Sequence, residues 1–352
     1  MAFGVYVHVP FCLRRCDYCA FATWDDRPHL IGAYVDGLRQ EISGAAPGLE
    51  PASSVFFGGG TPSLLTAKQL GGVLALVPLA PEAEVTVECN PDTVSPELLA
   101  GYRAAGVTRI SLGVQSMVPH VLAALGRTHD PAAVLRAVEA IRLVGFASWN
   151  VDLIYGAVGE SLDDWRTTVE RALALDPPHV SAYGLTVEPG TPLADDPSRH
   201  PDDDLQADEY VAADDALVAA GLGSYEISNW ATPGHECRHN SLYWSQGDYR
   251  GFGCAAHSHA AGRRWWNIRT PERYLSALAA GQSVEAAGET LDPGQRRLEG
   301  LQLSLRTRDG VPAAALPAGD LDLDDLVAPA GQRLVLTRRG RLLANEVALR
   351  LR

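Results

Sequence analysis

The stretch CLRRCDYCAF, residues 12–21, sets three cysteines at the spacing CxxxCxxC, with Phe21 two positions after the last of them. Soft thiolates select zinc or iron–sulfur chemistry. A structural zinc site takes four protein ligands, often from paired knuckles; no second knuckle follows here, although His8 or Cys89 could supply a fourth ligand. An iron–sulfur cube bound by only three cysteines instead leaves one iron open to a ligand from outside the polypeptide.

The cysteine loop follows the first of six short apolar segments that alternate with helical patterns. Strands are predicted at 4–10, 54–59, 85–90, 109–116, 149–156 and 179–186, and helices at 30–43, 66–77, 95–105, 131–144 and 161–175. Six βα units in succession predict a parallel sheet with right-handed crossovers. We therefore expect an α/β fold, an incomplete (β/α)6 barrel, followed by a smaller C-terminal α+β or helical module.

Alternation inside the strands predicts a cavity. Val5, Val7 and Val9 alternate with Tyr6 and His8, and the later strands repeat this pattern of one aliphatic and one partly polar phase. Residues two apart share a face of a strand, so the aliphatic face meets the helices. A closed eight-stranded barrel fills its lumen with branched apolar side chains. The partly polar inner face here suits a cavity that holds a polar ligand.

Composition narrows the classes of function. The chain has 352 residues, 46% hydrophobic and 20% charged, with a formal net charge of −14, which argues against a nucleic-acid partner. It opens on Met-Ala-Phe-Gly without the basic and apolar regions of a signal peptide, and no apolar run reaches the ~20 residues of a membrane span. We expect a cytoplasmic protein without a membrane anchor, whose six cysteines are metal ligands or buried thiols.

We divide the chain into a barrel core over residues 1–195, an extension of the barrel over 196–284 and a C-terminal module over 285–352. The extension carries CRHNSLYW at 237–244 and the Gly/Ala/His-rich GFGCAAHSHAAG at 251–262. In the module, a helix is predicted from Pro293 to Leu305 and another near 337–350.

The carboxyl ends of parallel strands meet at one end of such an array, where ligands bind. GGGTPS at 58–63 ends the second strand, where glycines allow close approach of the backbone and free N–H groups could meet a carboxylate or an amine-bearing group. Glu88 and Gln115 end the next two strands, and Arg127 follows in the loop GRTHD. Asp152 is an acid within an apolar strand, which indicates either a functional role or a buried ion pair with an arginine.

The three-cysteine loop and the GGGTP segment together resemble the radical S-adenosylmethionine (SAM) superfamily. In that superfamily the amino and carboxylate groups of SAM chelate the open iron of a 4Fe–4S cluster. The resemblance implies cluster ligation by Cys12, Cys16 and Cys19, contact of the GGGTP segment with the SAM amino group, and pairing of Arg127 with the carboxylate. The expected SAM contacts are Tyr6, Tyr18, Gly59, Gly60, Thr61, Glu88, Gln115, Arg127, Asp152 and Gly184.

Further motifs resemble the oxygen-independent coproporphyrinogen III dehydrogenase group over essentially the whole chain: YVHVPFC (6–12), FFGGGTPS (56–63), ECNP (88–91), LGVQS (112–116), GRTH (126–129) and DLIYG (152–156). The dehydrogenase itself has a fourth cysteine where this chain has Phe21, and a long segment before the first strand. Both departures look like the HemW-type heme chaperone branch, whose HNxxYW motif is matched by HNSLYW at 239–244.

The HNxxYW motif implies a heme site in the second half of the chain. An imidazole can ligate heme iron and aromatic faces can pack on a porphyrin, although a lone histidine is more often an ordinary hydrogen-bonded one. The residues implied for heme are His239, Asn240, Tyr243 and Trp244. Nearby alternatives are Cys237, Cys254, His257 and His259. The two histidines have strand spacing and could share a zinc ion, although no further paired ligands follow.

Two functions follow from the resemblance. A heme chaperone binds the cluster, SAM and heme, and delivers heme to apo-hemoproteins such as respiratory cytochromes in membrane complexes. The alternative is the dehydrogenase of porphyrin biosynthesis, which uses a SAM-derived radical to decarboxylate two propionates of coproporphyrinogen III. Phe21 disfavours that enzyme, and no catalytic residue is assigned. Either function calls for an electron donor to the cluster, and a homodimer is compatible with both.

Overall fold

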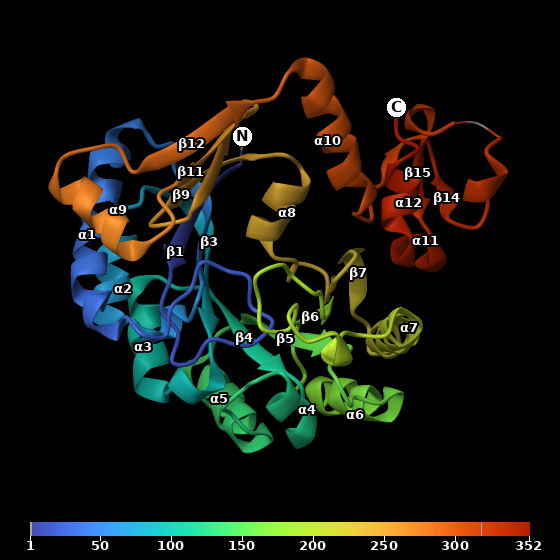
Figure 1. Cartoon of the computed structure of the whole chain (residues 1–352), viewed down its shortest axis with the longest axis horizontal. Helices are drawn as coiled ribbons and strands as arrows, with labels where there is room; N and C mark the ends of the chain where they lie inside the picture. Colours follow the sequence, from blue (N-terminus) through green and yellow to red (C-terminus); the bar gives the residue numbers. More distant parts are fainter. Residues whose placement is uncertain (1, 318) are drawn as a thin grey trace.

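The computed structural model describes residues 2–317 and 319–352 and is built on a twelve-stranded sheet (Figure 1). Its centre consists of parallel strands that pair in chain order. These strands are β1 (Phe3–Val9), β2 (Ala52–Gly59), β3 (Leu79–Cys89), β4 (Arg109–Gln115), β5 (Ser148–Tyr155) and β6 (His179–Gly184). The six predicted strands and their parallel arrangement are confirmed.

Helices cover the outer side of the curved sheet (Figure 1). Those that match the predicted helices are α1 (Ile31–Ala45), α2 (Ala67–Leu74), α3 (Pro96–Ala105), α5 (Pro131–Val144) and α6 (Leu162–Leu173). The short α4 (Pro119–Ala124) was not predicted. None of the described helices combines the length and the apolar composition needed to span a lipid bilayer.

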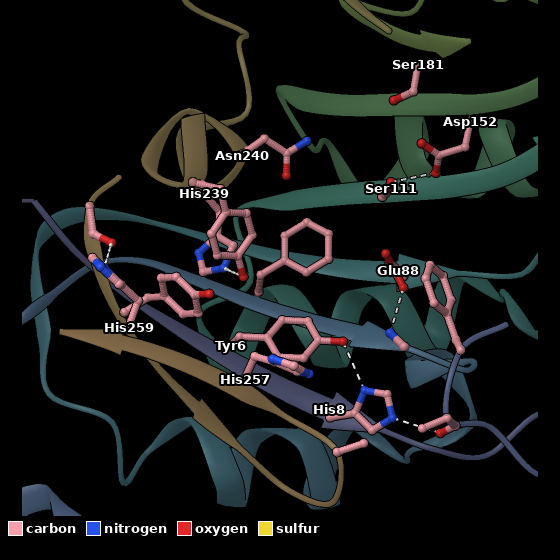
Figure 2. Close-up of a pocket in the computed structure, with 18 of the residues that line it drawn as sticks. Tyr6, His8, Glu88, Ser111, Asp152, Ser181, His239, Asn240, His257 and His259 are labelled. Atoms are coloured by element: carbon pink, nitrogen blue, oxygen red, sulfur yellow. Dashed lines mark hydrogen bonds between the residues drawn. The ribbon is translucent and has the colours of Figure 1, made fainter. Parts of the chain in front are cut away.

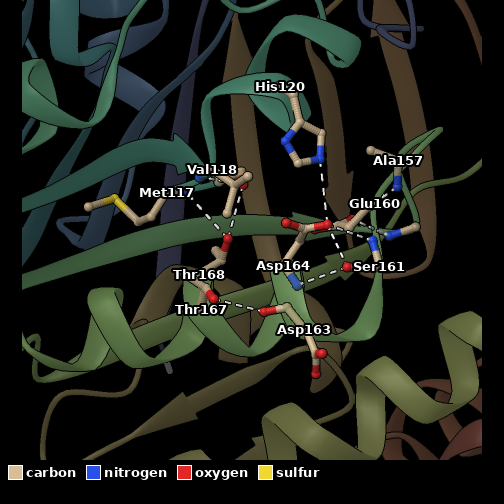
Figure 3. Close-up of polar contacts among 12 residues, drawn as sticks. Met117, Val118, His120, Ala157, Glu160, Ser161, Asp163, Asp164, Thr167 and Thr168 are labelled. Carbon is tan, nitrogen blue, oxygen red and sulfur yellow. Dashed lines mark hydrogen bonds and ion pairs between the residues drawn. The ribbon is translucent and has the colours of Figure 1, made fainter.

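The predicted helix starts are confirmed by their caps. The side chains of Thr66 and Ser95 accept hydrogen bonds from backbone amides in the first turns of α2 and α3. Figure 3 shows the start of α6, where Ser161 and Asp164 each accept a hydrogen bond from the other's backbone amide. Such a reciprocal capping box satisfies amides that a helix leaves without partners at its first turn.

The phase of the strands separates the core from a lumen, as the sequence predicts. Val5, Val7 and Val9 of β1 are fully buried in the main apolar cluster. Tyr6 and His8, on the other phase, line a cavity. Burying one valine contributes about 1.5–3 kcal/mol, and a one-residue slip of the strand would turn all three valines into the lumen. The register that fills the core therefore also fixes which side chains reach the cavity.

The sheet stays open, because β1 pairs with β9 rather than with β6, which confirms an incomplete barrel. The strands beyond β1 are β9 (Asp248–Phe252), β10 (His257–Ala260), β11 (Arg263–Asn267) and β12 (Glu285–Thr290), and α9 (Pro271–Ala279) joins the last two. Beyond β6 lie β8 (Asn229–Ala231) and β7 (Gly223–Glu226), preceded by α7 (Asp203–Ala219). α8 (Arg238–Trp244) packs against β1, β2 and α10 (Pro293–Leu305) (Figure 1).

The C-terminal part has an apolar cluster of its own, which includes Leu305, Val311 and Val347. Its elements are α10 (Pro293–Leu305), β13 (Val311–Pro312), β14 (Val327–Ala330), β15 (Arg333–Leu336), α11 (Arg338–Leu342) and α12 (Ala344–Ala348). The helix predicted at Pro293–Leu305 is confirmed, whereas the one predicted near 337–350 is two short helices that meet at Leu343. Because β12 pairs with β11 in the large sheet, we propose that the module begins at α10 rather than at residue 285.

Asp214 of α7 connects this module to the barrel. Its carboxylate is 3% exposed and lies 2.9 Å from Arg338 and 2.8 Å from Arg341, both on α11. The indole Nε1–H of Trp230 donates to the same carboxylate at 2.9 Å. One buried acid therefore joins α7, β8 and the module.

Candidate functional site

The loop with the three cysteines is closed at its base, directly after β1. The Cys12 amide donates to the Trp24 carbonyl at 3.0 Å. Cys12, Cys16 and Cys19 are free and partly exposed, and the Arg127 Nη1–H group donates to the Cys16 Sγ at 3.5 Å. Burial raises the pKa of the Cys12 thiol to about 11. A bound cation is therefore needed to hold this thiol as the thiolate, which is the form that ligates metals.

A cavity of about 450 Å³ adjoins the cysteine loop. All the predicted cluster ligands and all the predicted SAM contacts except Tyr6 line it: Cys12, Cys16, Cys19, Tyr18, Gly59, Gly60, Thr61, Glu88, Gln115, Arg127, Asp152 and Gly184. They come from the cysteine loop after β1, from β2 to β6 near their carboxyl ends, and from the loops after β2 and α4. The structure thus brings together residues that are 172 positions apart in the sequence, from Cys12 to Gly184.

The glycine turn corrects one expectation. Its amides are not free, because Gly59 N–H donates to Glu88 Oε2 (3.0 Å), Gly60 N–H to the Val9 carbonyl (2.8 Å) and Thr61 N–H to the Phe11 carbonyl (2.7 Å). Over the described residues, the Gly60 carbonyl accepts no hydrogen bond. A Cβ at Gly60 would stand 2.5 Å from the Phe11 carbonyl oxygen, so glycine is required for this close packing. The turn therefore offers an acceptor, which suits an amino group rather than a carboxylate.

Gln115 is aimed into the cavity by a local irregularity of β4. The register with β5 shifts between Gly113 and Gln115, and Gln115 has a φ of +65°. A left-handed conformation at a residue with a side chain costs about 1–3 kcal/mol, and such strain is typical of ligand sites. Gln115 lines the first cavity together with the cysteine loop and Arg127.

Two carboxyl groups lie on the lumen side of the same cavity. Asp152 accepts hydrogen bonds from Ser111 Oγ (2.7 Å) and Asn150 Nδ2 (2.9 Å), and burial raises its pKa. It takes part in no ion pair among the described residues, so the sequence-based alternative of a buried pair with an arginine is not what the structure shows. Burial, followed by the charge of Asp152, raises the pKa of Glu88 to about 8.

The raised pKa of Glu88 predicts a pH dependence of stability. Its folded-state value of about 8 exceeds the ordinary 4.5, so folding takes up a proton. The resulting stabilisation is complete below about pH 4.5 and is lost as the pH rises through about 8. In urea unfolding of the ligand-free protein, we expect the unfolding free energy of the wild type to fall relative to that of Glu88→Gln over this range. A difference that does not vary with pH would contradict the raised pKa.

A second cavity, of about 690 Å³, adjoins the first. Its walls come from β1 to β6, α8, β9 to β11 and α10, and Figure 2 labels residues of β1, β3 to β6, α8 and β10 around it. The aromatic and imidazole groups that line it are Tyr6, Phe21, Phe56, Tyr183, Tyr243, Tyr249, His8, His179, His239, His257 and His259. Tyr6, predicted as a SAM contact, therefore lies in the second cavity, where its hydroxyl meets His8 Nδ1 at 3.0 Å.

The HNSLYW motif forms α8 and supplies one wall of the second cavity. His239 is fully buried, with Nδ1 2.9 Å from Ser54 Oγ and Nε2 2.8 Å from the Tyr243 hydroxyl. Burial lowers its pKa to about 3, so the ring is neutral. Asn240 and Tyr243 line the cavity with it, whereas Trp244 lies on α8 outside this lining. Three of the four predicted heme residues thus line the second cavity. Both ring nitrogens of His239 already have hydrogen-bonding partners.

The two cavities share a wall. Glu88 and Asp152 line both, and so does Phe21, whose side chain remains 65% exposed. The other shared residues are Ala20, Gly59, Ser111 and Tyr183. A molecule in the second cavity would therefore lie directly beside a molecule in the first.

The cysteine loop fits a cluster better than a single metal ion. Within residues 2–317 and 319–352, no three His, Cys, Asp or Glu side chains converge on a point that could hold one ion. The proposed fourth zinc ligands have other partners: His8 Nε2 meets the Ala22 carbonyl at 2.9 Å, and Cys89 Sγ meets the Val87 carbonyl at 3.7 Å. An iron–sulfur cube takes its thiolates on different irons, so its ligands need not meet at one point.

Comparison with known proteins gives the same assignment at the level of the fold. A family model described as the radical SAM superfamily matches residues 6–172. The solved structure of the radical SAM enzyme coproporphyrinogen III oxidase (HemN) from Escherichia coli matches with a TM-score of 0.87, over 99% of this chain and 89% of that chain, at 23% identity. The fold is thus that of a radical SAM enzyme with the HemN arrangement.

Curated relatives match over most of their length and carry one name, heme chaperone HemW. The protein from Mycobacterium tuberculosis (strain H37Rv) is 45% identical over 98% of this chain and 93% of its own length. The protein from Escherichia coli K12 is 38% identical over 86% of this chain and 84% of its own length. The protein from Bacillus subtilis 168 is 32% identical over 98% of this chain and 97% of its own length. The chain therefore belongs to the HemW family of heme chaperones within the radical SAM superfamily.

Proposed function

We propose that this protein is a heme chaperone that binds a 4Fe–4S cluster, SAM and heme, and passes the heme to apo-hemoproteins. The observation that carries the proposal is the pair of adjoining cavities, one beside three thiols and one lined by aromatic rings and imidazoles. A volume of about 690 Å³ is within the range of cavities that hold a ligand of cofactor size. The similarity to curated heme chaperones supports heme as the occupant.

In this proposal the first cavity holds the cluster and SAM. Cys12, Cys16 and Cys19 would hold the cluster, which would supply a site for SAM and a source of one electron. The Gly60 carbonyl accepts a hydrogen bond from the SAM amino group, and the Arg127 guanidinium pairs with the SAM carboxylate. The other proposed SAM contacts are Tyr18, Gly59, Thr61, Glu88, Gln115, Asp152 and Gly184, while Tyr6 is assigned to the heme side.

For the heme iron we propose His257 of β10 as the ligand, with the HNSLYW motif as a wall. Among the histidines that line the second cavity, His257 is the one whose ring makes no hydrogen bond to the described residues, and it is exposed. Its ring stacks on Trp266, with centroids 5.7 Å apart, which holds it in place. His239, in contrast, would have to give up Tyr243 or Ser54 to bind iron.

Heme binding can be tested by anaerobic reconstitution with hemin, gel filtration and absorption spectroscopy. We expect a Soret band that survives gel filtration in the wild type, and a shifted, weaker band in His257→Ala that added imidazole restores. His239→Gln keeps a hydrogen-bonding amide and is expected to leave the band position unchanged. If the Soret band is lost in His239→Gln but not in His257→Ala, His239 is the heme iron ligand. If the wild type retains no Soret band after gel filtration, the proposed heme chaperone function is contradicted.

The second candidate is the coproporphyrinogen III dehydrogenase. The HemN fold favours it, because the second cavity could hold a tetrapyrrole substrate next to SAM, but the likeness at 23% identity concerns the fold alone. Phe21 stands on the shared wall where the dehydrogenase has its fourth cysteine. With SAM and a reductant under anaerobic conditions, we expect no protoporphyrinogen IX from coproporphyrinogen III. SAM-dependent formation of protoporphyrinogen IX would favour the enzyme.

The remaining parts of the proposal concern where the protein acts and which partners it has. We propose that it acts in the cytoplasm, that an electron donor reduces the cluster, and that the recipients include respiratory cytochromes in membrane complexes. The net charge of −14 leaves nucleic acid outside this set of partners. A homodimer stays a prediction.

A further inference from the structure

Arg109, the first residue of β4, is a buried charge in the wall of the second cavity. Gln115, at the other end of β4, lines the first cavity, so the two side chains lie about 20 Å apart along the strand. Arg109 is 2% exposed, and its Nε and Nη2 have no hydrogen-bonding partner in the part of the chain that the structure describes. Its guanidinium therefore has unused hydrogen-bond donors next to the cavity that the residue lines.

A further unpaired polar atom lies near Arg109, on His179. His179 Nε2 meets the Tyr225 hydroxyl at 2.8 Å, but His179 Nδ1 has no partner among the described residues. Ser111, Asn150 and His179 are in register across β4, β5 and β6. Together with Ser181 these residues form what we call the polar corner of the second cavity: Arg109, Ser111, Asn150, His179 and Ser181, each at most 5% exposed.

The charge of Arg109 is not neutralised by contact. Burial lowers the pKa of the guanidinium, and neighbouring acidic groups more than offset this, so the side chain stays charged. The carboxylates among those groups have other partners. Glu84 accepts from the amides of Arg238 (3.1 Å) and His239 (3.2 Å), and Asp152 accepts from Ser111 and Asn150. The acidic groups therefore stabilise the charge at a distance, but no carboxylate among the described residues contacts the guanidinium, and a planar anion could supply that contact.

We propose that the polar corner binds a carboxylate of the ligand in the second cavity, namely a propionate of the tetrapyrrole, with Arg109 as the main contact. This rests on the proposed heme binding. A carboxylate is planar and matches the two-pronged geometry of a guanidinium. The rings of Tyr6, Phe56 and Tyr243 line the remainder of the cavity, where the macrocycle would pack. The corner thus orients the tetrapyrrole with one propionate toward the β4–β6 wall.

The test compares hemin with hemin dimethyl ester, in which both propionates are neutral, on the full chain carrying its cluster. We expect the wild type to bind hemin at least about tenfold more tightly than the ester, as a buried charge-assisted contact provides. Arg109→Met removes the charge at similar length and should bind both compounds equally, whereas Arg109→Lys should retain part of the preference. Arg269→Met, which changes an exposed arginine that lines the same cavity, should keep most of the preference for hemin over the ester.

The melting temperature of the ligand-free protein separates a binding role from a structural one. If Arg109 serves the ligand, Arg109→Met should melt at or above the wild-type temperature, because it removes a charge without a contacting partner. A clearly lower melting temperature, with an unchanged preference for hemin, would overturn the proposal.

The remaining outcomes are equally distinct. Equal binding of hemin and ester by the wild type would overturn the carboxylate site and leave heme binding in place. No binding of either compound would overturn the proposed function itself. Loss of SAM rather than of the hemin preference in Arg109→Met would assign the corner to a SAM carboxylate and exclude the propionate.

Discussion

Replacing Cys16 with alanine is expected to abolish the iron–sulfur cluster and all SAM binding. Two thiolates cannot replace three as ligands of the cube, and Arg127 loses its contact with the Cys16 sulfur. After anaerobic reconstitution, iron and acid-labile sulfide should fall to background, and calorimetric titration with SAM should give no signal.

Cys254→Ala is the matched control for that variant. Cys254 is also a free cysteine, but it is buried and accepts a hydrogen bond from the Tyr34 hydroxyl at 3.5 Å. It lines neither cavity, so its removal should leave iron, sulfide and SAM binding at the wild-type level. Full iron in Cys16→Ala, or loss of iron in Cys254→Ala, would contradict the assignment of the ligands.

Replacing Asp214 with alanine is expected to lower the free energy of unfolding by about 1–3 kcal/mol, because it removes a buried acceptor of charge-assisted hydrogen bonds whose arginine partners are 43% and 17% exposed. Two guanidinium groups, of Arg338 and Arg341, and the indole of Trp230 would lose their common acceptor. The loss should appear in urea unfolding as a separate, earlier transition of the C-terminal module.

The control is Asp325→Ala, which breaks the pair between Asp325 and Arg339. Both of those side chains are more than 60% exposed, at 63% and 65%. An exposed ion pair contributes about 0–1 kcal/mol, so this variant should unfold almost like the wild type. If the two variants were equally stable, Asp214 would not be the connection between barrel and module.

The barrel core could be predicted because its signals are local. Each βα unit has an apolar alternating strand, a turn and a capped helix, and the capping residues Thr66, Ser95 and Ser161 mark the helix starts. Residues at the carboxyl ends of neighbouring parallel strands must meet, which brings Glu88, Gln115 and the cysteine loop to one cavity.

Other features depend on information that strand phase does not contain. The alternation of residues along a strand predicts which face of the sheet a side chain lies on, but not how far it lies from the end of the strand. Tyr6 lies three residues before the end of β1, about 10 Å along the strand, and therefore lines the second cavity. The amides of the glycine turn are taken by partners as distant as Glu88. Strand β9 pairs with β1 across more than 240 residues, and β10 lies in a Gly/Ala/His-rich stretch without clear alternation.

The burial of Arg109 also could not be predicted from the sequence. In the sequence Arg109 is the first residue of a predicted apolar strand, with nothing to separate it from a solvated residue. Only the pairing of β3 with β4, which sets Arg109 opposite Thr86, and the positions of His179 and Asn150 reveal a buried charge facing a cavity.

The central claim is that three thiolates hold a cube with one iron left for SAM. It is tested most directly by measuring iron, inorganic sulfide and zinc in protein purified without air, and by following its spectrum during titration with SAM. The account predicts a 4Fe–4S cluster whose electron paramagnetic resonance signal changes when SAM is added. A single zinc ion without sulfide, or a cluster whose spectrum does not respond to SAM, would contradict it.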